Sequence, residues 1–183
     1  MYPNMSTQTL SGKRILILAT DGFEQSELEV PQKKLSDLGA TVDVTAPKKG
    51  AIKGWNHTDW GNEVKVDFAL SDADVKDYDA LVLPGGQMNP DALRMEPEAI
   101  ALIKAFAAAG KPVAAVCHAP WLLIDAGLVK GRKVTSWPSV RTDLRNAGAT
   151  VVDQSAVIDR GIITSRKPED LDDFVEAIAS QLA

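Results

Sequence analysis

The fold of this chain is decided by the stretch GKPVAAVCHAP, residues 110–120. Residues 113–117 form a short, wholly apolar run, which is typical of a strand buried on both faces of a parallel sheet. Pro120 suits the first turn of a helix, and a helical pattern runs from it to Ala126. The stretch therefore predicts a buried strand, then a sharp turn at Cys117, then a helix.

Working outward, strands alternate with helices along the rest of the chain. Apolar or alternating runs predict strands, and apolar residues at helical spacing predict helices. The predicted strands are 14–20, 41–46, 80–83, 133–135 and a hairpin around 151–164, and the predicted helices are 24–38, 98–109, 140–146 and 168–182. Residues 47–62 are predicted to form a loop or a small hairpin. This order is typical of an α/β protein with a mainly parallel sheet and helices on both faces.

Length and composition indicate one ordinary globular domain. The chain has 183 residues, of which 45% are hydrophobic and 25% charged. Residues 1–12 carry no apolar stretch of the kind that a signal peptide needs, and they are predicted to be a flexible polar tail ahead of a domain over 13–183. The apolar runs are too short to span a membrane, and the single cysteine cannot form an internal disulfide. We therefore expect a cytoplasmic protein.

Charge and missing motifs narrow the functional classes further. The net charge is −5, and the one basic cluster, Lys48, Lys49 and Lys53, lies among glycines in a predicted loop. The sequence has no dinucleotide fingerprint, phosphate-binding P-loop, CxxC pair or HExxH helix. Its two histidines, His57 and His118, lie far apart in the sequence. We therefore expect no cofactor, no metal site, and neither nucleic acid nor membrane as a partner.

Three predicted strands end in distinctive residues. DGFE (21–24) follows the first strand, LPGG (83–86) ends the third, and CHAP (117–120) ends the strand quoted above. Because ligands bind at the carboxyl ends of the strands in open parallel sheets, these three ends predict one site. Their coincidence is more informative than any one of them.

Cys117 is the candidate nucleophile. It ends a strand and precedes a helix, where the positive end of the helix dipole lowers the pKa of a thiol and a sharp turn exposes the side chain. The alternative is a buried structural cysteine, and position alone does not separate the two. Glu24, at the start of the first helix, is the nearest candidate partner for the thiol. Its alternative role is a capping box with Asp21.

His118 and Gly86 complete the candidate site. Neighbouring residues on a strand point to opposite faces, so His118 meets the Cys117 thiol only if the turn bends both side chains to one side. The backbone N–H groups of Gly86 and His118 could stabilise a developing oxyanion, although two glycines also suit a plain tight turn. His57 is predicted to lie on the surface.

At these residues the sequence resembles the PfpI-type intracellular protease family, part of the superfamily that includes the parkinsonism-associated deglycase. The similarity extends over nearly the whole chain from Lys13 onward. It rests on ATDGFEQSEL, DALVLPGG, GKPVAAVCHAP, LVKGRKVTSWPSVRTDLRNAGA and ITSRKPEDL. The resemblance implies a glutamine amidotransferase-like fold, that is, a single-domain, flavodoxin-like three-layer sandwich with a nucleophile-elbow cysteine.

Carried over position by position, the resemblance implies that Cys117 is the nucleophile and that Glu24 is the acid that hydrogen-bonds it. The adjacent histidine is His118, and the oxyanion donors are the amides of Gly86 and His118. In protease-like members an acid after the LPGG turn reaches the histidine of a neighbouring subunit. Asp91 occupies that place here, one methylene shorter than the Glu of the archetype. Class I glutamine amidotransferases share the fold but use a distant C-terminal histidine, and none follows His118.

The resemblance implies three candidate functions. The first is a stress-protective enzyme of glyoxalase or deglycase type, in which Cys117 attacks an aldehyde such as methylglyoxal while Glu24 and His118 move protons. The second is an intracellular cysteine peptidase, completed through Asp91 when subunits assemble. The third is a non-enzymatic oxidative-stress sensor or chaperone that acts through Cys117 oxidation. We expect the first, in a homodimer or higher homo-oligomer, with a small reactive carbonyl or a peptide as substrate.

Overall fold

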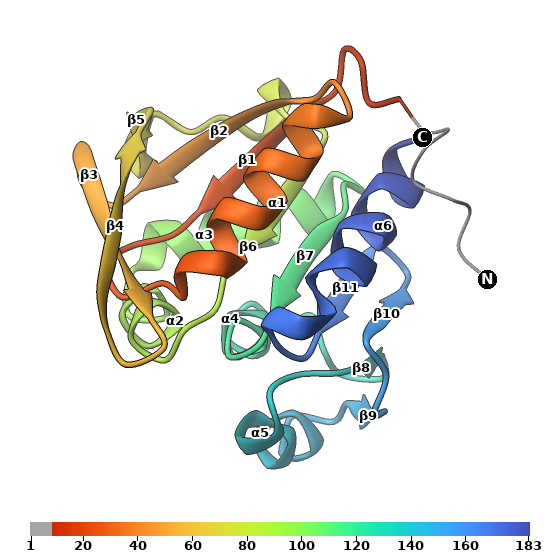
Figure 1. Cartoon of the computed structure of the whole chain (residues 1–183). Helices are drawn as coiled ribbons and strands as arrows, with labels where there is room; N and C mark the ends of the chain where they lie inside the picture. The colour runs from red at the N-terminus through yellow and green to blue at the C-terminus, as the bar shows by residue number, and fades with distance from the viewer. Residues whose placement is uncertain (1–8) are drawn as a thin grey trace.

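A seven-stranded sheet lies between two layers of helices in the computed structural model, which describes residues 9–183 (Figure 1). Its strands are β1 (Arg14–Leu18), β2 (Thr41–Ala46), β5 (Phe68–Ala69), β6 (Ala80–Leu83), β7 (Val113–Val116), β10 (Ala156–Asp159) and β11 (Ile162–Ser165). Their order is β10-β11-β7-β6-β1-β2-β5, and all neighbours are parallel except β10 with β11. The predicted α/β class is confirmed, and the order of the parallel strands is the flavodoxin-like one.

Helices cover both faces of the sheet because successive strand residues point to opposite sides. One layer holds α1 (Gln25–Asp37) and α6 (Leu171–Leu182), and the other holds α2 (Met88–Leu93), α3 (Pro97–Ala108) and α4 (Pro120–Asp125) (Figure 1). Ile15 and Ile17 of β1 belong to the core under the first layer, whereas Leu16 and Leu18 belong to the core under the second. All four are fully buried, so the sheet is apolar on both sides, as the sequence predicted.

Smaller elements flank this sandwich. β3 (Gly50–Asn56) and β4 (Asp59–Val66) form an antiparallel hairpin, β8 (Lys133–Val134) pairs with β9 (Thr150–Val151), and α5 (Arg141–Asn146) packs beside α4. Short 3₁₀ turns lie at Leu70–Asp72, Val75–Asp77, Pro138–Val140 and Pro168–Asp170. The sequence predicted a loop or a small hairpin over 47–62, and the structure extends that hairpin to Val66. Helix α2 was not predicted, because it is only six residues long and starts almost directly after LPGG.

The three distinctive strand ends meet at one edge of the sheet. β1, β6 and β7 point their carboxyl ends to this edge, where α2, α4 and one end of the hairpin also lie (Figure 1). The DGFE and LPGG segments touch through their backbones, since the Glu24 N–H donates to Gly85 O at 3.2 Å. Gly86 has a φ of +81°, and a Cβ there would lie 2.6 Å from Gly22 O. Only glycine permits this approach.

The first described residues are packed on the domain. Leu10 is fully buried, and its N–H donates to Leu38 O at 2.7 Å. The predicted polar tail therefore does not extend as far as Leu10, and residues 1–8 lie outside the described residues. No helix within residues 9–183 is long and apolar enough to cross a membrane.

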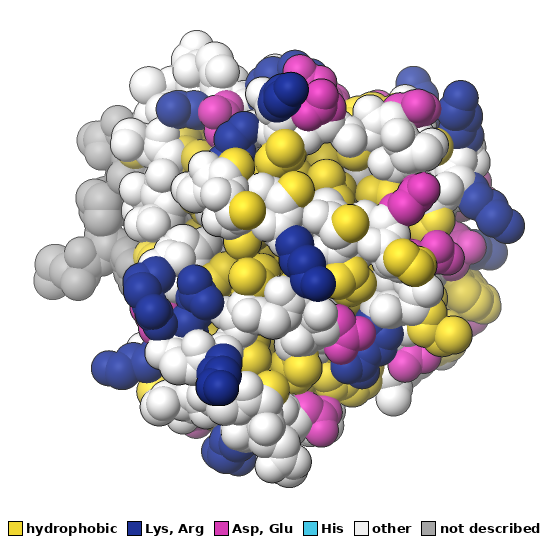
Figure 2. Space-filling view, turned by 180° about the vertical axis from the view of Figure 1, so that it is seen from behind, with side chains coloured by type: hydrophobic (Ala, Val, Ile, Leu, Met, Phe, Trp, Pro, Cys, Tyr) yellow, Lys and Arg dark blue, Asp and Glu magenta, His cyan; other side chains and the backbone are white. Residues whose placement is uncertain are grey.

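Charges of both signs share the surface that faces away from the viewer in Figure 1. Lys and Arg side chains are spread over this side, with several toward the lower left of the view, and Asp and Glu lie among them mainly along the top and the right (Figure 2). Small apolar groups separate them.

Candidate active site

The strand-to-helix turn after β7 holds Cys117 in a strained backbone conformation. Its φ is +64°, a left-handed conformation that costs a non-glycine residue about 1 kcal/mol or more. Backbone hydrogen bonds impose it: the Cys117 N–H donates to Ser165 O at 3.0 Å, and the Cys117 C=O accepts the Trp137 N–H at 2.9 Å. The predicted elbow is therefore present, and it is held by the neighbouring strand and loop.

The same turn brings the imidazole of His118 to the sulfur. Cys117 Sγ lies 3.2 Å from His118 Nδ1, so the elbow bends both side chains to one side. Burial lowers the pKa of His118, which leaves the ring neutral near pH 7 and able to accept a proton. His118 Nε2 lies 3.5 Å from Ser139 Oγ, and the ring stacks on Trp137 with centroids 6.0 Å apart. The imidazole is thus positioned from both sides.

The acid beside the thiol is Glu27. It lies in the first turn of α1, it is fully buried, and its carboxyl group interacts with the Cys117 thiol closely enough for each to shift the pKa of the other. Glu27 Oε1 accepts the Gly85 N–H at 3.0 Å, and Oε2 has no hydrogen-bond partner within residues 9–183. The predicted contact between Glu24 and the thiol is therefore corrected to Glu27.

Glu24 faces the hairpin instead. It is the extended residue just before α1, and its Oε1 accepts the His57 N–H at 3.3 Å and lies 3.7 Å from His57 Nδ1. Residues three apart on a helix lie on similar faces, but Glu24 is not yet helical, so its side chain departs in a different direction from that of Glu27. Both acids line the same pocket, one under the sulfur and one toward the hairpin.

Burial dominates the acid–base behaviour of the buried pair. It raises the pKa of Glu27 to about 8, with a further rise from the charge of Glu24, so the carboxyl group keeps its proton near pH 7. Burial first, and Glu27 second, raise the pKa of the Cys117 thiol, against the amides of Gly86 and His118, which lower it. The sequence predicted a lowered thiol pKa, but in the structure burial raises it by more than the two amides lower it. The thiol therefore needs a base.

The amides predicted as oxyanion donors converge on the sulfur. The backbone N–H groups of Gly86 and His118 come from different strand ends, and both lower the pKa of the Cys117 thiol. Gly85 is closely packed beneath them, because a Cβ there would lie 2.6 Å from Glu27 Oε1 and 2.9 Å from the Cys117 Cβ. An oxygen atom that develops negative charge next to Sγ would meet both donors.

A single pocket of about 290 Å³ gathers these groups. It is lined by Glu24, Glu27, Trp55, His57, Gly86, Gln87, Cys117, His118, Trp137, Pro168 and Glu169. His57 was predicted to lie on the surface. It is exposed, but at the hairpin tip it also borders the pocket. Sequence reasoning missed Glu27 and Glu169. The first had one signal, its place in the first helical turn after Glu24. The second lies in the ITSRKPEDL stretch, which supported the resemblance but was not assigned to the site.

Asp91 lies apart from these residues. It is exposed on α2, and within residues 9–183 no carboxylate hydrogen-bonds His118. Its role across an interface stays a prediction. Within the same residues, no cluster of three or more His, Cys, Asp or Glu side chains could hold a metal ion.

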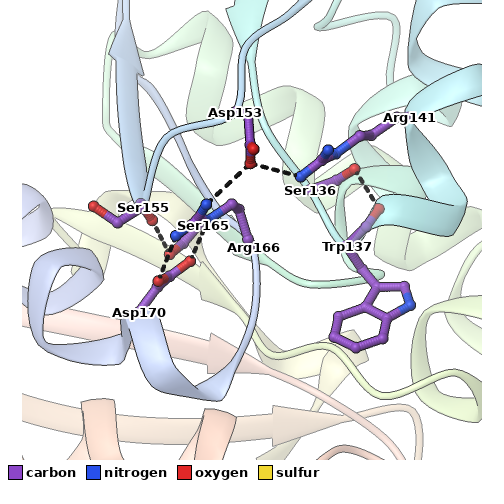
Figure 3. Close-up of polar contacts among 8 residues, drawn as sticks. All are labelled: Ser136, Trp137, Arg141, Asp153, Ser155, Ser165, Arg166 and Asp170. Carbon is purple, nitrogen blue, oxygen red and sulfur yellow. Dashed lines mark hydrogen bonds and ion pairs between the residues drawn. The ribbon is translucent and has the colours of Figure 1, made fainter.

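An ion-pair network braces one wall of the pocket (Figure 3). Arg166 donates two hydrogen bonds to the buried Asp170, at 2.7 and 3.0 Å, and a third to Asp153 at 2.9 Å. Arg141 donates to the same Asp153 oxygen at 2.8 Å. Asp153 therefore joins the segment that carries Trp137 to the turn that carries Glu169.

Comparisons with known proteins show the family to which this chain belongs. The family model described as DJ-1/PfpI family matches residues 13–181. Deglycase TK1284 of Thermococcus kodakarensis is 42% identical over 86% of this chain and 92% of its own length. YraA of Bacillus subtilis, whose name describes it as a candidate cysteine protease, is 42% identical over 88% of this chain and 94% of its own. The crystal structure of Drosophila melanogaster DJ-1beta superposes with a TM-score of 0.85 at 30% identity, over 93% of this chain and 90% of that one.

Proposed function

Because the chain belongs to the DJ-1/PfpI family, we propose that it is a stress-protective enzyme whose Cys117 acts on reactive carbonyl compounds such as methylglyoxal and their adducts. The observation that carries this proposal is the 3.2 Å contact between Cys117 Sγ and the Nδ1 of a neutral His118. That contact gives a buried thiol the base it needs, inside a pocket of about 290 Å³ that suits a small substrate.

The proposed reaction uses only the chain's own groups and water. His118 Nδ1 takes the thiol proton while Sγ adds to the aldehyde carbon of methylglyoxal. The C–S bond forms, the carbonyl electron pair moves to oxygen, and the amides of Gly86 and His118 stabilise the oxyanion, which is protonated to a hemithioacetal. A proton then moves from the former aldehyde carbon to its neighbour through an enediol, and water hydrolyses the resulting thioester. Methylglyoxal plus water gives lactic acid, and the thiol is regenerated.

The two acids have distinct places in this scheme. Glu27, protonated near pH 7, can donate to the sulfur or to the new oxygen beside it. Glu24, toward the hairpin, lines the part of the pocket that the rest of the substrate would occupy, where it can move the carbon-bound proton. The proposal therefore keeps Glu24 as a catalytic residue and adds Glu27 as the thiol's partner.

The test is lactate formation from methylglyoxal without added glutathione. We expect a steady release of lactate by the purified protein, and a loss of ~100-fold or more in Cys117→Ser and in His118→Ala. Glu98→Gln, a substitution at an exposed acid on α3, should leave the rate unchanged. Equal activity in Cys117→Ser would overturn the proposal. Circular dichroism on each variant separates loss of chemistry from loss of fold.

A peptidase is the second candidate function, favoured by the similarity to YraA and by the exposed position of Asp91. His118 has no carboxylate partner within residues 9–183, so an acid from a neighbouring subunit would be needed to orient it. A peptidase function predicts that only the most assembled species cleaves casein, and that Asp91→Ala abolishes this cleavage. If no assembled species from size-exclusion chromatography cleaves casein, this candidate fails.

A purely redox-sensing role receives less support. Oxidation of cysteine proceeds from an exposed thiolate, whereas Cys117 is 6% exposed and burial raises its pKa. Mass spectrometry after mild peroxide should therefore find Cys117 oxidised no faster than free cysteine. Rapid conversion of Cys117 to the sulfinic acid would instead support a redox-sensing role.

A further inference from the structure

Acidic side chains outnumber basic ones in the lining of the pocket. Three of its lining side chains are carboxyl groups, Glu24, Glu27 and Glu169, and no lysine or arginine of the described chain lines it. Glu27 keeps its proton near pH 7, which leaves Glu24 and Glu169 as the anionic groups. Both line the pocket that Cys117 also lines.

Glu169 is held at the mouth by the network described above. Glu169 is the exposed residue of the 3₁₀ turn Pro168–Asp170. It lies between Pro168, which also lines the pocket, and the buried Asp170, which Arg166 binds with two hydrogen bonds (Figure 3). Within residues 9–183, no cation forms an ion pair with Glu169 itself. The nearby guanidinium of Arg166 is instead committed to Asp153 and Asp170. The Glu169 charge is therefore not neutralised by a neighbour.

The imidazoles and amides of the pocket do not balance these charges. Burial keeps His118 neutral near pH 7, and His57 already lies against Glu24, 3.7 Å from its Oε1. The amides of Gly86 and His118 are at the floor, where they face the sulfur and any oxyanion next to it. They can stabilise the charge that develops in the reaction, but they do not stabilise a second negative charge elsewhere on the substrate.

We propose that Glu24 and Glu169 make this pocket select its substrates by charge, admitting neutral and cationic carbonyl compounds and excluding those that carry a carboxylate. The apolar walls formed by Trp55 and Trp137 favour the same choice, because aromatic faces attract cations and do not solvate anions. For the reaction itself this inference rests on the proposed function. For access to Cys117 it does not.

The first experiment measures access by alkylation. Iodoacetamide is neutral and iodoacetate is anionic, and both react with Cys117 in the same way: the C–S bond forms, the C–I bond breaks and iodide leaves. Cys117 is the only cysteine, so mass spectrometry of the intact chain reports its rate directly. The quantity of interest is the iodoacetamide-to-iodoacetate rate ratio at pH 7, divided by the same ratio for N-acetylcysteine.

We expect a normalised ratio of about 10 in the wild type at low salt. Each removed charge should lower it by about 3-fold, as expected for partly screened charges several Å apart. Glu169→Gln should therefore lower the ratio and Glu169→Lys lower it further, while the matched control Glu98→Gln should leave it unchanged. Raising the salt concentration should weaken the preference. A wild-type ratio equal to that of free thiol, or a ratio indifferent to both Glu169 substitutions, would overturn the inference.

The second experiment measures turnover. Methylglyoxal is compared with a dioxovalerate, which is methylglyoxal extended by a carboxylate-bearing chain. We expect kcat/KM for the anionic compound to be about 10-fold lower, and Glu169→Lys to recover much of the difference through KM. Equal kcat/KM for the two compounds would contradict charge selection. No turnover of either compound, together with a high alkylation ratio, would contradict the proposed function and leave charge selection standing.

Discussion

At the scale of single residues, the acidity of the Cys117 thiol depends on Glu27, a residue far from it in the sequence. The helix dipole predicts a thiolate, but the structure buries the sulfur near a protonated carboxyl group, and burial raises the pKa of the thiol. The reactive state must therefore be produced at the moment of attack, with His118 as the base. Because Glu27 raises the pKa of the thiol, it makes this proton transfer harder.

Replacing Glu27 should make the thiol more acidic. Glu27 raises the pKa of Cys117, and Glu27→Gln removes its charge and leaves an amide that can donate to the thiolate. We expect the pH profile of Cys117 alkylation by iodoacetamide to move to lower pH in Glu27→Gln. Glu24→Gln is the matched variant, and it should move the profile less. A larger shift in Glu24→Gln would return the role of thiol partner to Glu24.

Gly86 should tolerate no side chain. Its φ is +81°, and an added Cβ would lie 2.6 Å from the backbone of Gly22 and of Glu24. We expect Gly86→Ala to lower the free energy of unfolding by about 2–4 kcal/mol in urea titrations. Gly127→Ala is the control, since Gly127 has a φ of +72° but nothing within 4 Å, and it should cost only ~1 kcal/mol. Equal costs would mean that backbone conformation alone explains the glycine.

At the scale of elements, two walls of the pocket come from segments outside the seven-stranded sheet. The hairpin of β3 and β4 reaches the start of α1 through backbone hydrogen bonds, such as that from the Trp55 N–H to Phe23 O at 2.7 Å. The opposite wall is joined by the ion pairs of Asp153. These walls, rather than the sheet, are the parts whose motion would open or close access to the sulfur.

Removing the charge of Asp153 should loosen that wall without unfolding the protein. In Asp153→Asn, Arg141 and Arg166 lose their shared carboxylate, while the bond between Arg166 and the buried Asp170 remains. We expect faster amide hydrogen exchange in residues 137–141 and 166–170, and little change elsewhere. Asp37→Asn removes a comparable exposed pair, that with Lys33, and should leave both segments unchanged. Uniformly faster exchange throughout the chain would contradict a local role.

At the scale of the whole molecule, Glu27 makes stability depend on pH. Its pKa is about 8 in the folded state and near 4.5 when unfolded, so between these pH values the folded state binds more protons. The free energy of unfolding should therefore fall as pH rises from 4.5 to 8, by an amount on the order of 4 kcal/mol.

Chemical denaturation at several pH values tests this. Glu27→Gln keeps the size of the protonated side chain but cannot ionise, so its stability should vary less over the same range. Glu98→Gln, at the exposed acid on α3, should follow the wild type. Parallel curves for the wild type and Glu27→Gln would contradict the raised pKa.

Most of the fold could be predicted from the sequence, because apolar runs, helical periodicity and glycine stops are local signals. The same signals located Cys117, His118 and Gly86, which lie at strand ends. They could not distinguish Glu24 from Glu27, since that choice depends on where α1 begins relative to β7. Nor could they bring His57 to the pocket, because its position follows from contacts between the hairpin and α1 that no local pattern encodes.

The crowding beneath the sulfur also bears on how such a protein can diverge. At Gly85 a methyl group would lie 2.6 Å from Val116 O, so nothing larger than hydrogen fits without displacing the end of β7. Gln87 and Glu169, by contrast, line the mouth and are exposed, and exchanging them disturbs no packing. Descendants of this chain would therefore acquire new specificities by altering the mouth, while they inherit the surroundings of the thiol unchanged.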